Sequence, residues 1–429
     1  MSDSCGNMQF QMRRRHPILL AAVFLPILAI AAPFSNARAQ TLELTRQFGT
    51  PNDDSATGIH ADGLGNVYVT GATQGDLGGE NAGSYDAYLR QYDHSGNVQW
   101  TPQNGTFNAD GSNAVAADGA GSVYIAGAGS LGNPNDGNDS AFIAKYDATG
   151  EFQWLRNLGN GAPAFGYAVA TYGSGSVYLA GSTHGDLAGT NAGVFDDVFV
   201  SKLDSNGTIQ WTRQTGSSQT DVAQGVSADS EGSAYIAGYT FGALDGTNAG
   251  SADAFLLKYD STGQLEWTRQ FGTSMDDRGQ AVSADVFGNI YVAGLTRGTL
   301  AALSLGGYDA FLRKYDAHGT LLWSRQFGTS VDDRGFGVSV DNLGGVFVAG
   351  RTNGNLGASS AGGSDAFIAK FDEAGTLLWT QQLGTTSFDV VGAISADGFG
   401  NVYFSGGTGG SLAAPSAGDD DAFLGTISE

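Results

Sequence analysis

The chain repeats itself with a period of about 56 residues, and this period constrains its fold more than any other feature. The six tryptophans fall in one register, at intervals of 54, 57, 56, 56 and 56 residues: Trp100, Trp154, Trp211, Trp267, Trp323 and Trp379. A fixed period of this length is typical of repeat architectures, in which each unit buries its apolar face against its neighbours. We therefore expect a series of similar units.

Seven units are present when the two ends of the chain are counted together. Seven segments begin in the same way, at Asp86, Asp139, Asp197, Asp253, Asp309, Asp365 and Asp421. The last of them, DAFLGTISE at 421–429, stops halfway through a unit. The segment TLELTRQFGT at 41–50 matches QLEWTRQFGT at 264–273 almost residue for residue, so it supplies the missing half.

Each unit contains four short β patterns. In the fifth unit these are RGQAVSAD (278–285), GNIYVAG (288–294), DAFLRKYD (309–316) and TLLWSRQF (320–327). Apolar and polar residues alternate in the last two patterns, which indicates half-buried strands. D-x-x-G turns separate the first pattern from the second and the third from the fourth, so each unit is predicted to be a four-stranded antiparallel meander.

Such units could form an open solenoid or a closed propeller. An open array would leave both half-units with bare strand edges and unpaired backbone groups. The split repeat therefore favours closure. The sequence predicts an all-β, seven-bladed β-propeller with four antiparallel strands per blade, closed by an N-terminal strand at about 41–48 that joins the C-terminal blade.

The repeated motifs resemble those of the bacterial SBBP repeat proteins. The resemblance rests on D-x-x-G-N-V-Y, which continues as V-x-G at 62–71 and as F-x-G at 397–406, and on D-A-F-x-x-K-Y-D at 253–260 and 309–316. It implies a seven-bladed β-propeller, exported or held at the cell surface. It implies no established activity and no cofactor.

The N-terminus has the pattern of a secretory signal peptide. A basic segment, Arg13 to Arg15, precedes an apolar run that ends in the small-x-small site Ala37-Arg38-Ala39. An uncleaved membrane anchor is the alternative, but prolines shorten the apolar run below the roughly 20 residues that a span needs. We predict a signal peptide at 1–39, a single propeller domain at 40–429, and a secreted, periplasmic or cell-surface location.

The acidic charge limits the possible partners. The formal net charge is −23, and residues 1–39 carry four Arg and one Asp, so the remaining chain carries −26. Such a chain is repelled by nucleic acids and by anionic membrane surfaces. We expect a monomer without a membrane span after signal cleavage, with a protein or a glycan as its partner.

The connections predict which face of the ring binds a partner. The D-x-x-G hairpins are tight and lie on one face, whereas the opposite face carries long loops such as ATQGDLGGENAGSY at 72–85. Long loops that a rigid scaffold positions often carry function. We name this surface the long-loop face and expect ligand or partner contacts there.

An aspartate recurs on the long-loop face just before the first strand of a unit. The six positions are Asp54, Asp110, Asp221, Asp277, Asp333 and Asp389, and Phe165 takes the seventh place. A ring of carboxylates could bind Ca²⁺, which takes six to eight oxygen ligands. The alternative is that each side chain caps backbone N–H groups of its own loop. We expect no cofactor, with calcium as the open alternative.

Units two and three depart from the repeat, and an asymmetric ligand would need such a departure. The candidate residues for the binding face are Asn133, Asn135, Asp136, Asn138, Asn160, Phe165 and Tyr172. We expect these irregular segments to be neighbours on the long-loop face. Neutral drift in loops, which tolerate change, is the alternative explanation.

The sequence contains no complete set of catalytic residues, so no catalytic residue is predicted. DATGEFQW at 147–154 and DEAGTLLW at 372–379 are similar to the docking motif of quinoprotein propellers, in which Trp clamps adjacent blades. We expect all six tryptophans to be such structural clamps. The favoured function is a non-catalytic extracytoplasmic binding or scaffolding propeller; the alternatives are a quinoprotein-like or other propeller enzyme and a purely structural or adhesive protein.

Overall fold

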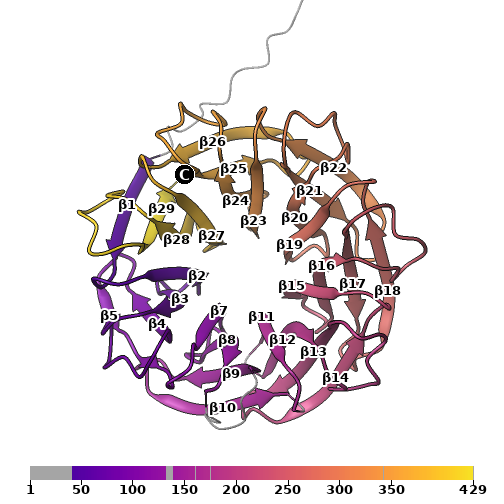
Figure 1. The fold of residues 1–429 in the computed structure, drawn as a ribbon, viewed down its shortest axis with the longest axis horizontal. Coiled ribbons are helices and arrows are strands. Elements are labelled where there is room, and N and C mark those ends of the chain that lie inside the picture. Colours follow the sequence, from indigo (N-terminus) through magenta and orange to yellow (C-terminus); the bar gives the residue numbers. More distant parts are fainter. Residues whose placement is uncertain (1–40, 132–138, 160, 174, 342, 429) are drawn as a thin grey trace, which may run out of the picture. The chain divides into compact units, whose positions relative to one another are not determined.

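Seven antiparallel sheets are arranged around a central channel (Figure 1). The computed structural model describes residues 41–131, 139–159, 161–173, 175–341 and 343–428. These ranges belong to one unit that spans 40–429. The predicted all-β, seven-bladed propeller is confirmed, and no helix in the described ranges is long and apolar enough to cross a membrane.

The strands follow one another from the channel outwards in each blade. Blade one contains β2 (Asp54–Ala61), β3 (Val67–Thr73), β4 (Asp86–Tyr92), β5 (Val98–Trp100) and β6 (Gln103–Asn104); blade two contains β7 (Gly111–Ala117), β8 (Val123–Gly129), β9 (Ser140–Tyr146) and β10 (Phe152–Leu158); blade three contains β11 (Ala164–Tyr172), β12 (Ser176–Thr183), β13 (Asp197–Asp204) and β14 (Ile209–Thr215). Blade four contains β15 (Asp221–Ala228), β16 (Ala234–Thr240), β17 (Asp253–Tyr259) and β18 (Leu265–Phe271); blade five contains β19 (Asp277–Ala284), β20 (Ile290–Thr296), β21 (Asp309–Tyr315) and β22 (Leu321–Phe327); blade six contains β23 (Asp333–Val340), β24 (Val346–Thr352), β25 (Asp365–Phe371) and β26 (Leu377–Leu383); blade seven contains β27 (Asp389–Ala396), β28 (Asn401–Thr408), β29 (Asp421–Ser428) and β1 (Thr41–Phe48).

The N-terminal strand closes the ring, as predicted. β1 pairs antiparallel with β29, from Thr41 opposite Ser428 to Phe48 opposite Ala422. Figure 1 shows the indigo β1 beside the yellow β29. The Nε2 atom of Gln47 donates to Asp421 Oδ2 at 2.7 Å, and the same bond joins Gln270 to Asp253 within blade four at 2.9 Å. The split blade therefore has the same internal bonds as a continuous one.

The core lies between blades. The second and third strands are buried on both faces, as in β20 and β21, whereas the outer strand β22 begins exposed. One cluster joins Tyr235 and Leu256 of blade four to Val292 and Phe311 of blade five. Because strands buried on both faces need a neighbour on each side, every blade depends on the next one.

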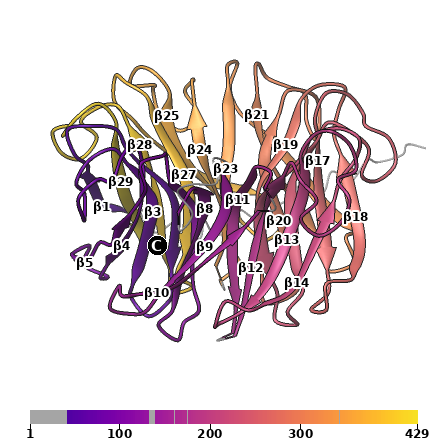
Figure 2. The same cartoon turned by 60° about the horizontal axis from the view of Figure 1, so that its bottom comes forward.

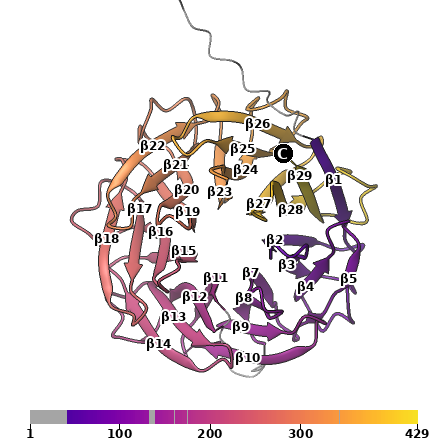
Figure 3. The same ribbon diagram turned by 180° about the vertical axis from the view of Figure 1, so that it is seen from behind.

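The D-x-x-G turns form as predicted, on the face opposite the long loops (Figures 2 and 3). Asp260 is one example: its Oδ1 accepts bonds from the backbone N–H of Thr262 at 2.9 Å and of Gln264 at 2.8 Å. Gly263 has a φ of 82°, a left-handed conformation that glycine adopts without a Cβ penalty. A Cβ on Gly263 would also lie 2.7 Å from the Trp211 ring.

Five tryptophans donate a hydrogen bond from the indole N–H to the next blade. The Nε1–H of Trp267 in blade four donates to the carbonyl of Ala317 in blade five at 3.2 Å. Arg269, two residues later, donates from Nε to the carbonyl of Gly319 at 2.8 Å. The other four tryptophans that donate to the next blade are Trp100, Trp154, Trp211 and Trp323.

Trp379 differs from the other tryptophans. It faces blade seven, where the third strand ends at Ser428 and the fourth begins at Thr41, so no turn joins them there. The ring of Trp379 lies 6.1 Å from the ring of Phe347 within its own blade. Among the residues that the structure describes, Trp379 therefore packs against the core and has no turn of the next blade as a hydrogen-bond partner.

This difference gives a matched test of the clamp. Trp267→Phe removes the indole N–H but keeps an aromatic ring, so it should lower the free energy of unfolding by about 1 kcal/mol more than Trp379→Phe does. Chemical denaturation of both variants and the wild type measures the difference. Equal losses in the two variants would show that the hydrogen bond to the next blade contributes nothing.

Candidate functional site

The six recurrent aspartates brace the start of each blade. Each is buried at the beginning of the innermost strand, and its Oδ2 accepts bonds from the Thr or Ser four residues earlier. Asp277 accepts from the backbone N–H of Thr273 at 2.6 Å and from its hydroxyl at 2.8 Å. Asp54, Asp110, Asp221, Asp333 and Asp389 make the equivalent bonds.

All six carboxylates cap their own loop through Oδ2. Within the described ranges, no group of three His, Cys, Asp or Glu side chains is placed to hold a metal ion. Burial and the neighbouring Asp309 raise the pKa of Asp333, although its hydrogen bonds to Thr329 and Thr352 oppose this effect. These aspartates are components of the scaffold that positions the site.

The assignment of Phe165 to the aspartate position is wrong by one residue. Ala164 lies opposite Thr183, as Asp221 lies opposite Thr240, so Ala164 occupies the aspartate position in blade three. Phe165 is the second residue of β11, and its ring stacks on Tyr167 at a centroid distance of 6.2 Å. The loop before β11 differs from its counterparts in the other blades, and alignment by sequence alone shifted the register.

Tyr172 does not lie with Phe165, contrary to the prediction. It is the last residue of β11, beside the tight turn on the face opposite the long loops. Its hydroxyl donates to the carbonyl of Ser230 in the next blade. The other candidates in these two units lie outside the described residues: Asn133, Asn135, Asp136, Asn138 and Asn160.

A β-bulge recurs at the same place in every innermost strand. The register skips one residue, for example between Gly279 and Ala281 in β19 and between Gly335 and Gly337 in β23. A bulge redirects the extra side chain, and these residues line the channel. The seven are Thr57, Asn113, Tyr167, Gln224, Gln280, Phe336 and Gly392.

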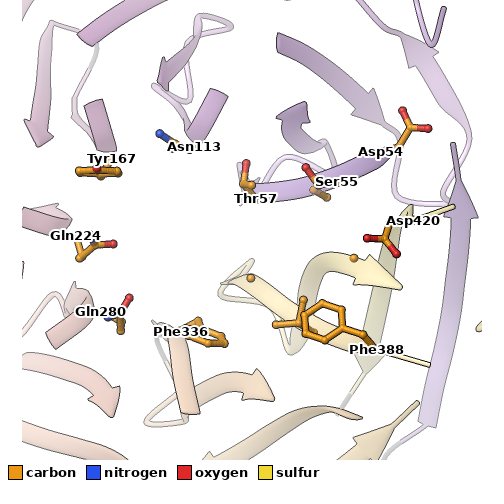
Figure 4. Close-up of a pocket in the computed structure, with 14 residues that line it drawn as sticks. Asp54, Ser55, Thr57, Asn113, Tyr167, Gln224, Gln280, Phe336, Phe388 and Asp420 are labelled. Carbon is orange, nitrogen blue, oxygen red and sulfur yellow. The ribbon is translucent and has the colours of Figure 1, made fainter. Parts of the chain in front are cut away.

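The bulge residues form the floor of a pocket on the long-loop face. The pocket has a volume of about 400 Å³ and is also lined by Asp54, Ser55, Phe388, Val390 and Asp420. Figure 4 shows Tyr167, Gln224, Gln280 and Phe336 around the same space as Asn113 and Thr57. Residues from all seven blades therefore converge here. Neighbouring blades contribute different residue types at the bulge, except blades four and five, which both contribute Gln.

The pocket is open towards blades seven and one because the side chains there are small. The second residue of each innermost strand lies opposite a residue of the next strand outward. In blade six this pair is Arg334 and Arg351, whereas in blade seven it is Val390 and Gly407. A Cβ on Gly407 would meet no atom within 4 Å. The blades contribute unequal volumes, so the cavity lies to one side of the channel.

The polar groups of the pocket are amides, hydroxyls and carboxylates. Asn113 is held by a bond from its Nδ2 to the carbonyl of Gly166 at 2.8 Å. Burial raises the pKa of Tyr167, so its hydroxyl stays protonated at neutral pH. Burial, followed by the charges of Asp53, Asp419 and Asp421, raises the pKa of Asp420. The pocket combines hydrogen-bond donors and acceptors with aromatic surface.

The part of the channel farther from the long-loop face encloses about 320 Å³ and is lined mainly by small residues. His60 lies there, and burial lowers its pKa to about 4, an effect that the charge of Asp62 opposes. His60 is therefore neutral at pH 7. It lines this part of the channel and is not part of the pocket on the long-loop face.

The bulge residues are not among the site residues predicted from the sequence. The sequence does contain a signal for them. The third residue after the recurrent aspartate varies in size from Gly to Phe and includes Thr, Asn and Gln, whereas the residues on either side of it are small. Strand alternation alone cannot identify it, because a bulge breaks the period of two.

Comparisons with known proteins agree with the fold. Four segments match the beta-propeller repeat SBBP: residues 45–78, 210–243, 266–300 and 322–357. The regulatory protein FlaEY of Caulobacter vibrioides is 28% identical over 192 residues, which are 39% of this chain and 20% of FlaEY. The match therefore spans about a fifth of that protein.

Two solved structures of an ulvan lyase, a polysaccharide lyase of family PL25, have a similar fold. The free lyase superposes with a TM-score of 0.51 and the lyase bound to -[GlcA(1-4)Rha3S]- with 0.50. Each is 13% identical and covers 88% of this chain and 95% of the lyase chain. At this identity the likeness shows a shared fold.

Two of the buried aspartates, Asp333 and Asp221, should give the stability a distinct pH dependence. The pKa of Asp333 is raised in the folded chain above its ordinary value of 3.8, so its contribution to stability is present below that value and is lost as pH rises through the folded pKa. Asp333→Asn removes this loss. The free energy of unfolding of the variant minus that of the wild type should therefore increase as pH rises above about 4.

Denaturation at a series of pH values measures this difference. Asp221→Asn should behave in the same way, because burial also raises the pKa of Asp221. A difference that is constant from pH 4 to 7, or that falls, would contradict the assignment.

Proposed function

We propose that this chain, four segments of which match the beta-propeller repeat SBBP, is an extracytoplasmic binding protein that holds a saccharide in the pocket on its long-loop face. The observation that carries this proposal is the varied set of side chains that six of the seven bulges direct into one cavity, while the seventh bulge residue, Gly392, leaves space. A repeat protein needs identical residues for packing, so the variation at this position is best explained by a ligand.

The chemistry of the lining suits a sugar. Tyr167, Phe336 and Phe388 provide aromatic surface, on which the apolar face of a sugar ring can pack. The amides of Gln224 and Gln280 each offer donors and an acceptor, as sugar hydroxyl groups require. Pockets of this kind combine apolar surface with a few polar groups that fix orientation.

The size of the pocket favours a small ligand or the end of a chain. Its volume of about 400 Å³ lies in the lower part of the range of roughly 300–1,000 Å³ that small-molecule sites occupy. A protein helix, about 10–12 Å across with its side chains, would need a larger groove. A glycan is therefore preferred here to a protein partner.

A binding role is preferred to catalysis because of the titratable groups. Among the described residues, the pocket lining contains no His, Lys or Cys, and its ionisable groups are Asp54, Asp420 and Tyr167. Asp54 is already bonded to Thr50. The ulvan lyase shows that a propeller of this fold can bind a saccharide, and we take only that possibility from it.

Location outside the cytoplasm is part of the proposal. It is supported by the basic and apolar pattern of residues 1–39, which lie outside the described part of the chain. The absence of cysteine from residues 40–429 means that export would introduce no disulfide, so folding depends on the blade interfaces alone.

Gly407 offers a direct test of the pocket. Gly407→Phe should fill the cavity without strain, because nothing lies within 4 Å of the added Cβ. A glycan array identifies oligosaccharides that bind residues 40–429, and the variant should then lose binding by roughly tenfold or more, while its Tm stays close to that of the wild type.

Gly407→Ala is the matched control, since one methyl group leaves most of the volume free. It should retain binding within about twofold. Unchanged binding by Gly407→Phe would place the ligand elsewhere, and the absence of any glycan that binds would overturn the proposed function.

A further inference from the structure

Four arginines gather on the long-loop face of blades five and six, in a chain that is otherwise strongly acidic. We name Arg278, Arg297, Arg334 and Arg351 the arginine cluster. The guanidinium carbons of Arg334 and Arg297 lie 4.4 and 5.7 Å from the centre of the Tyr308 ring. The Tyr308 hydroxyl donates to Asp276 Oδ2 at 2.6 Å, so this bond links the residues just before β21 and β19 within blade five.

Arg334 and Arg351 form an unusual pair within this cluster. They lie directly opposite each other on β23 and β24, where two like charges destabilise a sheet. The carboxylate next to the pair is that of Asp332, whose Oδ2 accepts a bond from Arg334 Nη2 at 2.8 Å. The Nε atoms of both arginines are buried and have no hydrogen-bond partner.

At the same position in blade five, the positive charge of the single arginine is neutralised by an aspartate. Arg278 bonds to Asp276 at 3.1 Å and lies opposite an apolar residue, Leu295. In blade seven the position is occupied by Val390 and Gly407, which carry no charge. An unpaired second arginine in blade six is therefore not required by the blade architecture.

Arg351 reaches the wall of the pocket. Its guanidinium carbon lies 5.5 Å from the centre of the Phe388 ring, and Phe388 lines the pocket and is 43% exposed. Phe336, on the pocket floor, is two residues after Arg334 on the same strand. Burial, and next to it the charge of Arg334, lowers the pKa of Arg351, and the charge of Asp332, which Arg334 shares, opposes this effect only in part.

We propose that Arg334 and Arg351 bind a carboxylate of the ligand, so that the saccharide class recognised by the pocket is one that contains uronic acid. This inference rests on the proposed function. The planar guanidinium group matches a carboxylate with two parallel N–H···O bonds, which adds geometric selectivity to the attraction of opposite charges. The bound carboxylate would also relieve the repulsion between the two arginines, which gives the ligand part of its binding energy.

The test compares an acid with its neutral form. Calorimetry at low salt would measure binding of an oligogalacturonate and of the same oligosaccharide as its methyl ester to residues 40–429. The wild type should bind the acid roughly tenfold more tightly or better, and the difference should shrink as added salt screens the charges.

Three variants separate the subsite from the pocket. Arg351→Gln should bind acid and ester equally and keep the affinity for the ester. In the absence of ligand its Tm should be equal to that of the wild type or higher by about 1–3 °C, because the repulsion is gone. Arg278→Gln is the matched control at the equivalent position, and it should retain the preference for the acid. Gly407→Phe should lose both ligands.

The outcomes distinguish this inference from the proposed function. Equal binding of acid and ester by the wild type, with both lost in Gly407→Phe, overturns the carboxylate subsite and leaves the pocket. If Arg351→Gln still binds the acid more tightly than the ester, the carboxylate subsite is also overturned. The same holds if the wild type binds a sulfated oligosaccharide without uronic acid tightly and does not bind the uronate. Failure of both galacturonate forms to bind, with neutral sugars still binding, also overturns the subsite alone; failure of all sugars overturns both proposals.

Discussion

The pairing of β1 with β29 is the interaction on which the rest of the structure depends. Each blade buries its second and third strands on both sides, so a blade without a neighbour would expose the apolar residues that hold it together. Closure gives all seven blades two neighbours. The pocket depends on it directly, because Asp54 and Ser55 of blade one and Val390, Gly407 and Asp420 of blade seven line the same cavity. If the ring did not close at this junction, those residues would not form one wall.

Symmetry supports the ring, and the breaks in symmetry produce the site. The buried aspartates and the Trp clamps recur because every blade junction needs them. The bulge residues and the facing pair on the two inner strands are not needed in the same form at every junction, although Thr57 and Asn113 bond to the next blade, and they are free to differ. The facing pair is Arg334 and Arg351 in blade six, and Val390 and Gly407 in blade seven. One side of the channel mouth is therefore cationic and crowded, and the adjacent side is hollow.

The architecture could be predicted from the sequence because its signals are periodic. The tryptophan register and the split last repeat define the number of blades and the closure, and the D-x-x-G turns define the hairpins. The site could not be predicted in the same way. A bulge inserts one residue into the two-residue alternation of a strand, so Gln280 and Phe336 could not be assigned to the channel from periodicity. The register of Phe165 depends on the length of the loop before β11. Tyr172 lies at the end of β11, so it is on the face of the tight turns and not on the long-loop face.

Hydrogen exchange at the closing strands tests the central claim most directly. In residues 40–429, the amides of β29 (Asp421–Ser428) should exchange as slowly as those of β25 (Asp365–Phe371), the equivalent strand of blade six, because both strands are paired on two sides. The amides of β1 that bond to β29 should be protected with them. If β29 instead exchanges at the rate of an edge strand while β25 stays protected, the ring is open, and the pocket between blades seven and one does not exist as described.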